Sequence, residues 1–465
     1  MLKTDKENNK INVLFFNGNK SAGVNYYRTI TPATELENIA GDIFHIEIWN
    51  KIDYKDPELM NKLKRFDIIH YHKQLHPDVN VMMKISAELK ENGTTLVMDV
   101  DDYWHLDKDH ALFELHIKQK YGLKTVFNLK TADYITTTSD HFAKTIKTVT
   151  GKDNVIVFEN SVNPVWMKQF ENNHKPDPDG LVRIIYMAGS THRKDVELLR
   201  GVVNMLQADK ETKNKFKIII AGWNAAGKKK EAVFNQDLGK DLHDLGLWDE
   251  KMVNDINKSK GDIMVINRIP NNIKEQYKGK IFILEETTID SKESPYWFYE
   301  EILTDNHRLI QQDDYKRWLL TFEENGVYDN EHNFGRRWTE NVNKYAKVLD
   351  EADIVLAPLQ TTKFNQHKSN LKMVESWTRK LPVVCSDVIP YNLDGIDNVN
   401  CVLVKNKKNS AKHWKKRLKE LILDPEKRRV IGDGLYNTFK EKYNLENVTK
   451  RRSEFYQKIV KENKK

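Results

Sequence analysis

Polar and charged side chains are concentrated late in the chain between two apolar runs, at residues 352–359 and 381–386. Amides at a helix start can bind a diphosphate, a cation can stabilise it as a leaving group, and a carboxylate further along can accept ribose hydroxyls. The ordinary alternative is a helix start capped by Ser369, with Glu375 in water. The segment predicts a nucleotide-sugar site, with Lys368 also acting in catalysis, built from Phe364, Asn365, His367, Lys368, Ser369, Lys372 and Glu375.

A second candidate anion site follows the apolar run at residues 182–188. Gly189 and Ser190 allow a ligand to approach the backbone closely. Arg193 or Lys194 can neutralise the β-phosphate as the leaving group gains charge, so we expect both to bind the donor and Arg193 to act in catalysis. The alternative is an ordinary capped helix start whose basic side chains point into solvent.

Three carboxylates, Asp99, Asp101 and Asp102, close the apolar run at residues 94–100. Because side chains alternate along a strand, Asp99 and Asp101 share one face at the strand end. We expect Asp101 and Asp102 to act in catalysis or to orient the acceptor. The alternatives are a divalent metal site of the Asp-x-Asp kind and a solvated turn in which Asp102 caps the next helix. Further candidates are His70, His72 and His105.

The elements that would position these groups alternate between strands and helices. Strands are predicted at residues 11–16, 43–48, 67–71, 94–100, 134–138 and 155–159, with helical periodicity between them at 79–91 and 141–150. A second series of strands is predicted at residues 182–188, 216–221, 262–265, 354–357, 382–385 and 402–404. This alternation indicates an α/β protein with two Rossmann-like, doubly wound domains.

The domain organisation follows from this pattern. We expect an N-terminal, acceptor-side domain at residues 1–170 and a nucleotide-sugar-binding domain at residues 181–410. The polar segment between them carries two prolines and is typical of a linker. Residues 225–345 break the alternation, which predicts an insertion that elaborates the second domain. Residues 411–465 are predicted to be helices that pack back towards the N-terminal domain.

Length and composition favour a folded protein in the cytoplasm. The chain has 465 residues, of which 39% are hydrophobic, enough for two cores. The charged start has no apolar region of a secretory signal, and no apolar run approaches the roughly 20 residues needed to cross a bilayer. Cys385 and Cys401 lie in apolar contexts and are expected to be core residues. We expect cytoplasmic localisation, in the host cytoplasm if the protein is viral.

The positive charge is concentrated at the end of the chain. Residues 401–465 hold 20 Lys and Arg against 8 Asp and Glu, more than the net charge of +7 of the whole chain. A basic face of this kind could contact anionic lipid headgroups at a membrane surface, nucleic acid or an acidic acceptor. The alternative is a solvated helical face.

Several of these blocks together resemble the retaining glycosyltransferases of family 4, also called group 1, of a bacterial or phage-encoded type. The resemblance spans nearly the whole chain but is strong only in blocks. It is carried by Gly23 with Tyr26–Arg28, by residues 99–104, 132–139, 160–163, 186–194 and 352–359, and by Phe364, Asn365, Lys368, Ser369, Lys372, Glu375 and residues 382–386.

The resemblance implies the GT-B fold, in which two domains face each other across a cleft. The donor would be a UDP-sugar or GDP-sugar that lies mostly on the second domain, and the sugar would be transferred with retention, without a metal or other cofactor. The loop flanked by Gly18 and Gly23 would face the donor phosphates and the acceptor, although any strand-to-helix turn can need glycine. Tyr27 and Arg28 could equally pack against the next helix and cap it.

The chain departs from the family in one motif. Family members carry Glu-x7-Glu, in which the second Glu contacts the donor ribose. Here Glu375 matches the second position, whereas His367 occupies the first. This departure leaves open an alternative function, a catalytically degenerate protein that binds a glycan or nucleic acid. The acceptor of an active enzyme could be a glycan, a lipid-linked glycan, a protein or, for a phage enzyme, a modified DNA base.

Overall fold

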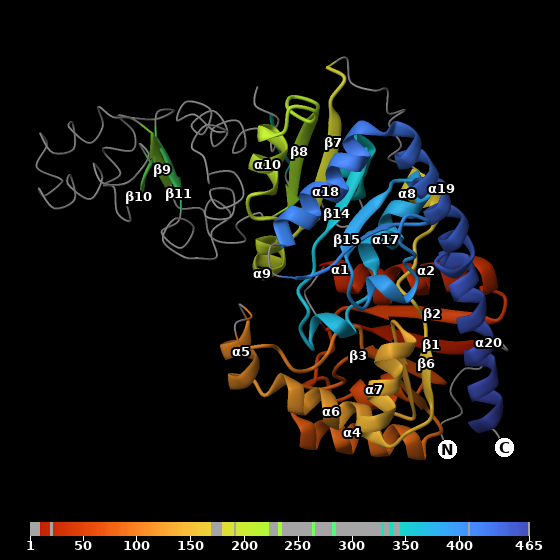
Figure 1. Cartoon of the computed structure of the whole chain (residues 1–465). Coiled ribbons are helices and arrows are strands. Elements are labelled where there is room, and N and C mark those ends of the chain that lie inside the picture. The colour runs from red at the N-terminus through yellow and green to blue at the C-terminus, as the bar shows by residue number, and fades with distance from the viewer. Residues whose placement is uncertain are drawn as a thin grey trace, which may run out of the picture.

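Two large β-sheets, each covered by helices, dominate the described part of the chain and lie one above the other in Figure 1. The computed structural model describes residues 10–18, 22–108, 110, 112–168, 179–189, 192–222, 231–234, 263–265, 281–284, 327–329, 334–337, 345–407 and 410–463.

The first sheet has six parallel strands in the order β2-β1-β3-β4-β5-β6. Their bounds are β1 (Ile11–Phe16), β2 (Phe44–Trp49), β3 (Ile68–His72), β4 (Thr95–Asp99), β5 (Tyr134–Thr137) and β6 (Val155–Val157). The helices of this half are α1 (Ala22–Asn25), α2 (Thr31–Ala40), α3 (Leu59–Leu63), α4 (Val79–Glu91), α5 (Phe113–Lys118), α6 (Tyr121–Thr131), α7 (Asp140–Thr150) and α8 (Pro164–Lys168), with a π-helical turn at Tyr26–Ile30.

Helices cover both faces of this sheet because its strands are apolar on both faces. Along β1, Leu14 and Phe16 pack with α4 and α7, whereas Val13 and Phe15 pack with α2 and with the last helix of the chain. This alternation is the pattern of a buried parallel strand. Because the strands are parallel, their carboxyl ends lie along one edge of the sheet, where side chains can contact a ligand.

Capping residues fix the bounds of the longer helices. The Asp78 side chain accepts hydrogen bonds from the N–H groups of Asn80 and Val81 at the start of α4, and Ser139 caps α7 in the same way. Gly151 ends α7 in the left-handed conformation. Such caps satisfy backbone groups that have no partner within the helix.

The second sheet has seven strands in the order β12-β13-β8-β7-β14-β15-β16, and β12 alone is antiparallel to its neighbour. Their bounds are β7 (Val182–Ala188), β8 (Phe216–Gly222), β12 (Val327–Asp329), β13 (Phe334–Arg337), β14 (Ile354–Ala357), β15 (Val383–Ser386) and β16 (Val402–Val404). The helices are α9 (Arg193–Val196), α10 (Val202–Ala208) and α17 (Leu371–Ser376). Cys385 and Cys401 are both free and buried in the core of this half.

One predicted strand lies elsewhere. Residues 262–265 were expected in the second large sheet, but β10 (Ile263–Val265) pairs instead with β9 (Glu231–Phe234) in a separate antiparallel sheet completed by β11 (Ile281–Leu284). The position beside β8 belongs to β13. Only Phe334 of that strand is a large apolar residue, so the sequence gives β13 little hydrophobic signal.

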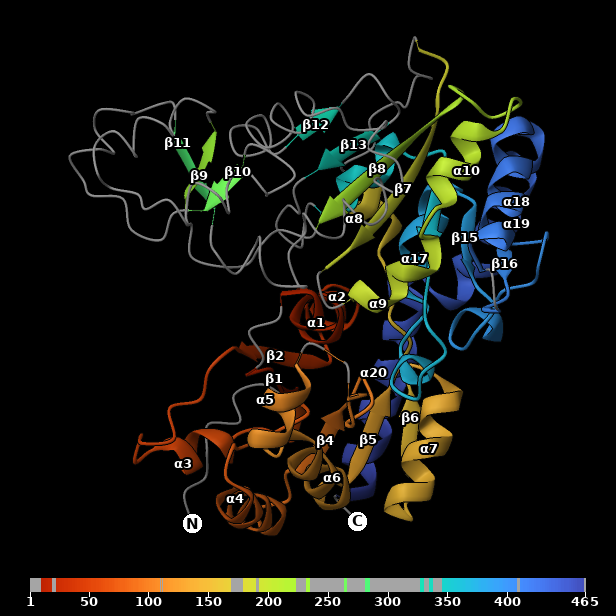
Figure 2. The ribbon, with the colours of Figure 1, turned by 60° about the vertical axis from the view of Figure 1, so that its left-hand side comes forward.

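Three helices complete the chain, α18 (Ser410–Leu423), α19 (Pro425–Lys442) and α20 (Leu445–Asn463). α18 packs in the core of the second sheet, whereas α20 contacts α2 and β4 of the first (Figures 1 and 2). Nine Lys and Arg residues of these helices form ion pairs, with Asp209, Asp397, Asp394 and Glu159 among the partners. None of the helices described is long and apolar enough to span a membrane.

Candidate functional site

Segments that follow strands of the two large sheets contact one another. From the first sheet come the turn after β1, the loop after β4 and the start of α7. From the second come the loop after β7 and residues 358–375 after β14. In parallel sheets these are carboxyl ends of strands, where ligands bind. The contacts fall into five groups, around Glu375, Lys368, Asp195, His367 and Asp99.

Glu375 lies on α17 and is almost completely buried, with 1% of its surface exposed. Its Oε1 accepts a hydrogen bond from the Tyr27 hydroxyl at 3.2 Å and contacts the Tyr345 hydroxyl, and its Oε2 accepts one from Lys372 Nζ at 3.0 Å. Burial and the Glu375 charge raise the pKa of both tyrosines well above the usual value, so both remain protonated donors. The alternative in which Glu375 faces water is therefore wrong.

Lys368 is half-buried in the loop before α17, and its Nζ lies 4.8 Å from the centre of the Phe364 ring. Burial, and next the charge of Lys368, lowers the pKa of His110 from the first half. Burial also lowers the pKa of His192, against its hydrogen bond with Asp195, and Lys368 and Lys372 contribute to this shift. The region around Lys368 therefore holds two lysines, Lys368 and Lys372, and histidines whose pKa values are lowered. This arrangement favours binding of an anion.

Asp195, at the third position of α9, holds the loops after β7 and β14 together. Its carboxylate accepts hydrogen bonds from His192 Nδ1 at 2.8 Å, from the Gln360 N–H at 2.7 Å and from Asn365 Nδ2 at 2.9 Å. The side chain is buried. Asp195 is not among the residues predicted from the sequence, although an acid three positions after His192 on a short helix is a signal for such a contact.

Three residues that the sequence predicts as donor ligands instead contact protein groups. Phe364 is buried in the core of the first sheet, and the Ser369 hydroxyl accepts a hydrogen bond from Asn160 Nδ2 at 2.8 Å. Asn365 is held by Asp195. Phe364 and Ser369 therefore join the second half to the first, and Ser369 does not cap the helix start through a side-chain hydrogen bond.

His367 occupies the position of the first Glu in the family motif, and it is buried. Its Nδ1 lies 2.7 Å from the carbonyl oxygen of Lys363, so this nitrogen donates, and its Nε2 accepts from the Thr145 hydroxyl at 2.9 Å. The ring stacks on Tyr103 with 4.6 Å between centres. Burial lowers the pKa of His367, which keeps the imidazole neutral. Both nitrogens thus have protein partners.

A chain of alternating charges lies at the ends of β3 and β4. Arg28 Nε donates to Asp99 at 3.0 Å, and His72 Nδ1 lies 3.0 Å from the same carboxylate oxygen. On its other side, His72 Nε2 lies 3.3 Å from Asp101, which also pairs with Lys73 Nζ at 2.7 Å. Asp99 and Asp101 do share one region, as the alternation predicts, with His72 between them.

The charges in this chain reinforce one another. Burial acts to raise the pKa of Asp99, but Arg28 and His72 outweigh it and hold that pKa well below the usual value. Lys73 and His72 likewise outweigh burial at Asp101 and lower its pKa. Burial acts to lower the pKa of His72, yet Asp101 and Asp99 raise it. Asp101 is therefore a carboxylate with about a tenth of its side chain exposed, and Asp102 is more open.

The Asp-x-Asp metal alternative has no support in this geometry. Asp99 and Asp101 are both neutralised by side-chain cations, and the part of the chain that the structure describes contains no group of three or more His, Cys, Asp or Glu side chains placed to hold a metal ion.

Solved structures resemble the chain over almost its whole length. A glycosyltransferase from Rickettsia africae matches with a TM-score of 0.52 at 12% identity, covering 97% of this chain and 99% of the other. Anabaena HepE in complex with UDP-glucose matches with a TM-score of 0.52 at 11% identity, covering 96% and 100%. Sucrose-phosphate synthase from Thermosynechococcus elongatus matches with a TM-score of 0.50 at 10% identity, covering 97% and 99%. The chain has the GT-B fold.

Sequence comparisons add little to this GT-B assignment. No protein-family model matches the chain. The ribonucleoside-diphosphate reductase large subunit of Ostreid herpesvirus 1 is 54% identical over 46 residues, which is 10% of this chain and 6% of that protein. A match of 46 residues is too short to span either large sheet, and it indicates nothing about the activity of the whole chain.

The other residues predicted for the donor site are three glycines, Ser190, Arg193 and Lys194. Gly18 and Gly189 are exposed, and a Cβ atom added to Gly23 or Gly189 would meet nothing within 4 Å. Neither of these two glycines has a positive φ, so backbone conformation does not require them. Lys194 is half-buried beside Asp195. Ser190 and the side chain of Arg193 lie outside the described residues, so the proximity of Arg193 to Lys368 stays a prediction.

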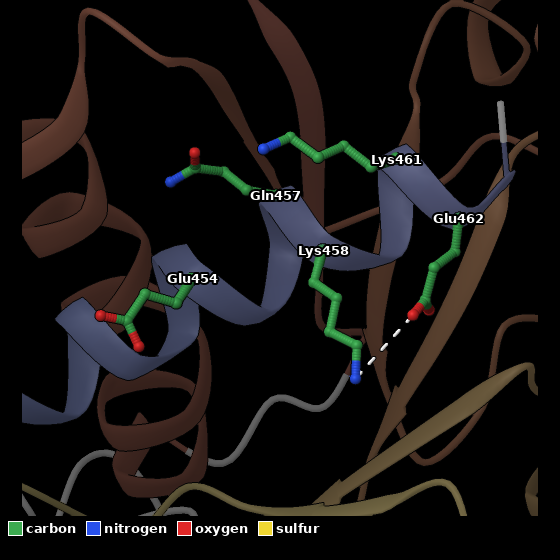
Figure 3. Close-up of a pocket in the computed structure, with 5 residues that line it drawn as sticks. All are labelled: Glu454, Gln457, Lys458, Lys461 and Glu462. Atoms are coloured by element: carbon green, nitrogen blue, oxygen red, sulfur yellow. Dashed lines mark ion pairs between the residues drawn. The ribbon is translucent and has the colours of Figure 1, made fainter. Parts of the chain in front are cut away.

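A surface hollow of about 410 Å³ lies away from these groups, along α20 (Figure 3). All its lining residues belong to that one helix, and both signs of charge are present, with Lys458 Nζ 3.8 Å from Glu462. It contains none of the predicted site residues: its lining is Glu454, Gln457, Lys458, Lys461 and Glu462.

Proposed function

We propose that this protein transfers a sugar from a nucleoside-diphosphate donor, a UDP-sugar or a GDP-sugar, to a hydroxyl-bearing acceptor. The observation that carries the proposal is the buried Glu375 carboxylate, which lies between Tyr27 of one half and Lys372 of the other, seven residues after Lys368. The fold is shared with a protein solved in complex with UDP-glucose. We place the chain among the retaining enzymes of family 4.

On the donor side, Glu375 accepts ribose hydroxyls. An ionised carboxylate offers about four acceptor positions, and the three present donors are side chains that a ligand hydroxyl can replace. Lys368 and Lys372, with Arg193 or Lys194, stabilise the diphosphate as it leaves. These cations supply the charge stabilisation that a metal ion provides in other enzymes, so the proposed reaction needs no metal.

On the acceptor side, Asp101 and Asp102 orient the attacking hydroxyl. Asp101 is suited to accept a hydrogen bond because His72 and Lys73 keep it ionised. Arg28 and Asp99 are positioning residues that fix His72. Retention means that the diphosphate leaves from the same face of the sugar that the acceptor hydroxyl attacks. Exclusion of water when the halves close limits hydrolysis of the donor.

The experiment is calorimetric titration with UDP-glucose and with GDP-sugars, followed by turnover of the donor that binds. Lys368→Ala and Glu375→Ala are each expected to lower kcat/KM at least tenfold, and Lys416→Ala, at an exposed position of α18, is the matched control. Wild-type turnover in both site variants contradicts the site assignment. Binding of no nucleotide by the wild-type protein contradicts the function.

A second function, glycan binding without catalysis, is favoured by one observation. His367 is buried, neutral and held by Thr145 and Lys363, so it cannot take the place of the first Glu beside the sugar. Nucleotide binding distinguishes the two functions, because a degenerate site should bind none. A modified DNA base as acceptor receives less support, since the basic helices pair many of their cations with carboxylates. A cytoplasmic location stays a prediction.

A further inference from the structure

An exposed apolar surface lies on α5 and α6, in the first half of the chain. Six large side chains here expose between 40% and 57% of their surface, and they are Leu112, Leu115, Ile117, Tyr121, Leu123 and Phe127. No residue of α5 is buried. A helix that buries none of its side chains gains little from the protein itself, so a concentration of exposed apolar side chains on two adjacent helices indicates an interaction site.

The charges on these two helices are mostly positive, with Glu114 in the first turn of α5 as the exception. Residues 115–131 contain Lys118, Lys120, Lys124 and Lys130 and no Asp or Glu. Lys118, Lys120 and Lys130 are exposed, and Lys124 Nζ lies 6.0 Å from the centre of the Tyr121 ring. Apolar side chains with lysines among them suit the boundary between headgroups and acyl chains of a bilayer, where lysines contact anionic lipids.

A second apolar surface on the same protein shows that this combination is specific. Leu393, Ile396 and Val399 are exposed to a similar degree, and Ile396 has the same 57% exposure as Ile117. That surface instead carries the carboxylates Asp394 and Asp397. Those carboxylates pair with Lys442 and Arg417, so the charge there is balanced, and of these two surfaces the α5–α6 surface has the excess of lysines that complements an anionic membrane.

The α5–α6 surface borders the candidate site. A Cβ atom on Gly122, at the start of α6, would lie 2.5 Å from the carbonyl oxygen of Trp104, so α6 begins directly against the loop that follows Asp101. Just before α5, the His110 ring lies 5.4 Å from that of Phe364. α5 stands at the left edge of its half in Figure 1 and comes to the front in Figure 2.

We propose that the surface formed by α5 and α6 docks the protein on an anionic lipid bilayer and so presents the site to an acceptor held in that membrane. Docking itself stands on the surface alone, whereas the statement about the acceptor rests on the proposed function. Leucine and isoleucine side chains enter the headgroup boundary, and the lysines remain at the level of the lipid phosphates.

The test is co-sedimentation of the full chain with vesicles of phosphatidylcholine, with and without phosphatidylglycerol. We expect binding to the anionic vesicles only, weakened by added salt. Lys118→Gln with Lys120→Gln and Lys124→Gln should weaken binding by about fivefold per lysine, roughly a hundredfold together. Leu115→Ser with Ile117→Ser should also release the protein. The matched controls are Ile396→Ser and the pair Lys412→Gln with Lys416→Gln, which should bind like the wild type.

Other outcomes overturn the proposal. These are absence of vesicle binding, binding without regard to lipid charge, or equal binding by surface and control variants. A change from dimer to monomer in Leu115→Ser with Ile117→Ser, without a change in vesicle binding, assigns the surface to a second copy of this chain. Titration with UDP-glucose and GDP-sugars in solution, without lipid, tests the proposed function separately, so each can fail alone.

Discussion

The hydroxyl of Tyr27 lies 3.2 Å from Oε1 of Glu375, although the two residues are 348 positions apart in the chain. One belongs to the turn after the first strand and the other to the second half. The carboxylate that we assign to the donor ribose is therefore also a contact between the halves. Donor binding and the arrangement of the halves should depend on each other through this pair.

Coupling between Tyr27 and Glu375 can be measured by a double-mutant cycle. Tyr27→Phe and Glu375→Gln should show a coupling of about 1 kcal/mol in the free energy of unfolding in urea, because Tyr27→Phe removes the donor of this buried hydrogen bond and Glu375→Gln replaces its charged acceptor with a weaker, neutral one. Tyr54→Phe is the control, since its hydroxyl donates to Leu75 within the first half. Tyr54→Phe should be additive with Glu375→Gln, and additivity in both cycles contradicts the contact.

Two neighbouring histidines should give stability opposite dependences on pH. The pKa of His72 is raised above its usual value of about 6.5, so its contribution is complete below that pH and is lost as the pH rises through the folded-state pKa. The pKa of His70 lies well below 6.5, chiefly because of burial, so His70 costs stability as the pH falls below 6.5.

The measurement is urea unfolding of wild type, His72→Gln and His70→Gln between pH 5 and pH 9. The difference in the free energy of unfolding between wild type and His72→Gln should shrink above neutral pH. The corresponding difference between wild type and His70→Gln should shrink below neutral pH. Parallel curves for all three proteins contradict the assigned environments.

Asp195 should be needed for both stability and donor binding. Asp195→Ala leaves the Gln360 N–H without its acceptor and removes one of the two acceptors of the Asn365 amide, which should cost about 2 kcal/mol in the free energy of unfolding. Donor affinity should fall at least tenfold because the loops after β7 and β14 lose their link. Asp195→Asn retains an acceptor oxygen and should lose less of both. Normal donor affinity in Asp195→Ala argues that the loops are not part of the site.

Restoring the family motif should not help this protein. His367→Glu places a buried carboxylate against the Lys363 carbonyl oxygen and the Tyr103 ring, and should destabilise the protein by about 2–4 kcal/mol. His367→Gln keeps a neutral polar group and should cost less. Higher turnover by the Glu variant at unchanged stability contradicts our description of this position.

Much of the architecture could be predicted from the sequence because buried parallel strands are short apolar runs with distinct ends. Strands β7 and β16 have the predicted bounds, and helix α4 does also. The strand at Phe334–Arg337 could not be predicted, because a segment with a single large apolar residue shows no alternation of apolar and polar side chains. The strand at Ile263–Val265, which was predicted in the wrong sheet, lies in the same predicted insertion at residues 225–345. The proposed domain boundaries stay predictions.

The site was predictable only where its residues are near one another in sequence. Glu375 and Lys372, both predicted from the segment after β14, contact each other, whereas their roles at the donor stay predictions. Lys73, Asp195 and Tyr345 were missed, because their roles come from contacts with distant segments. His367 was expected at the donor, but neighbouring aromatic rings and Thr145 make it a buried structural residue.

The packing of α20 against α2 and β4 has a consequence for biosynthesis. Part of one side of the first sheet stays uncovered until α20 has left the ribosome, since Tyr456, Ile459 and Val460 pack there beside α2. The earliest-translated half of the polypeptide thus cannot mature before the last, and it must wait, partly uncovered, for its closing segment.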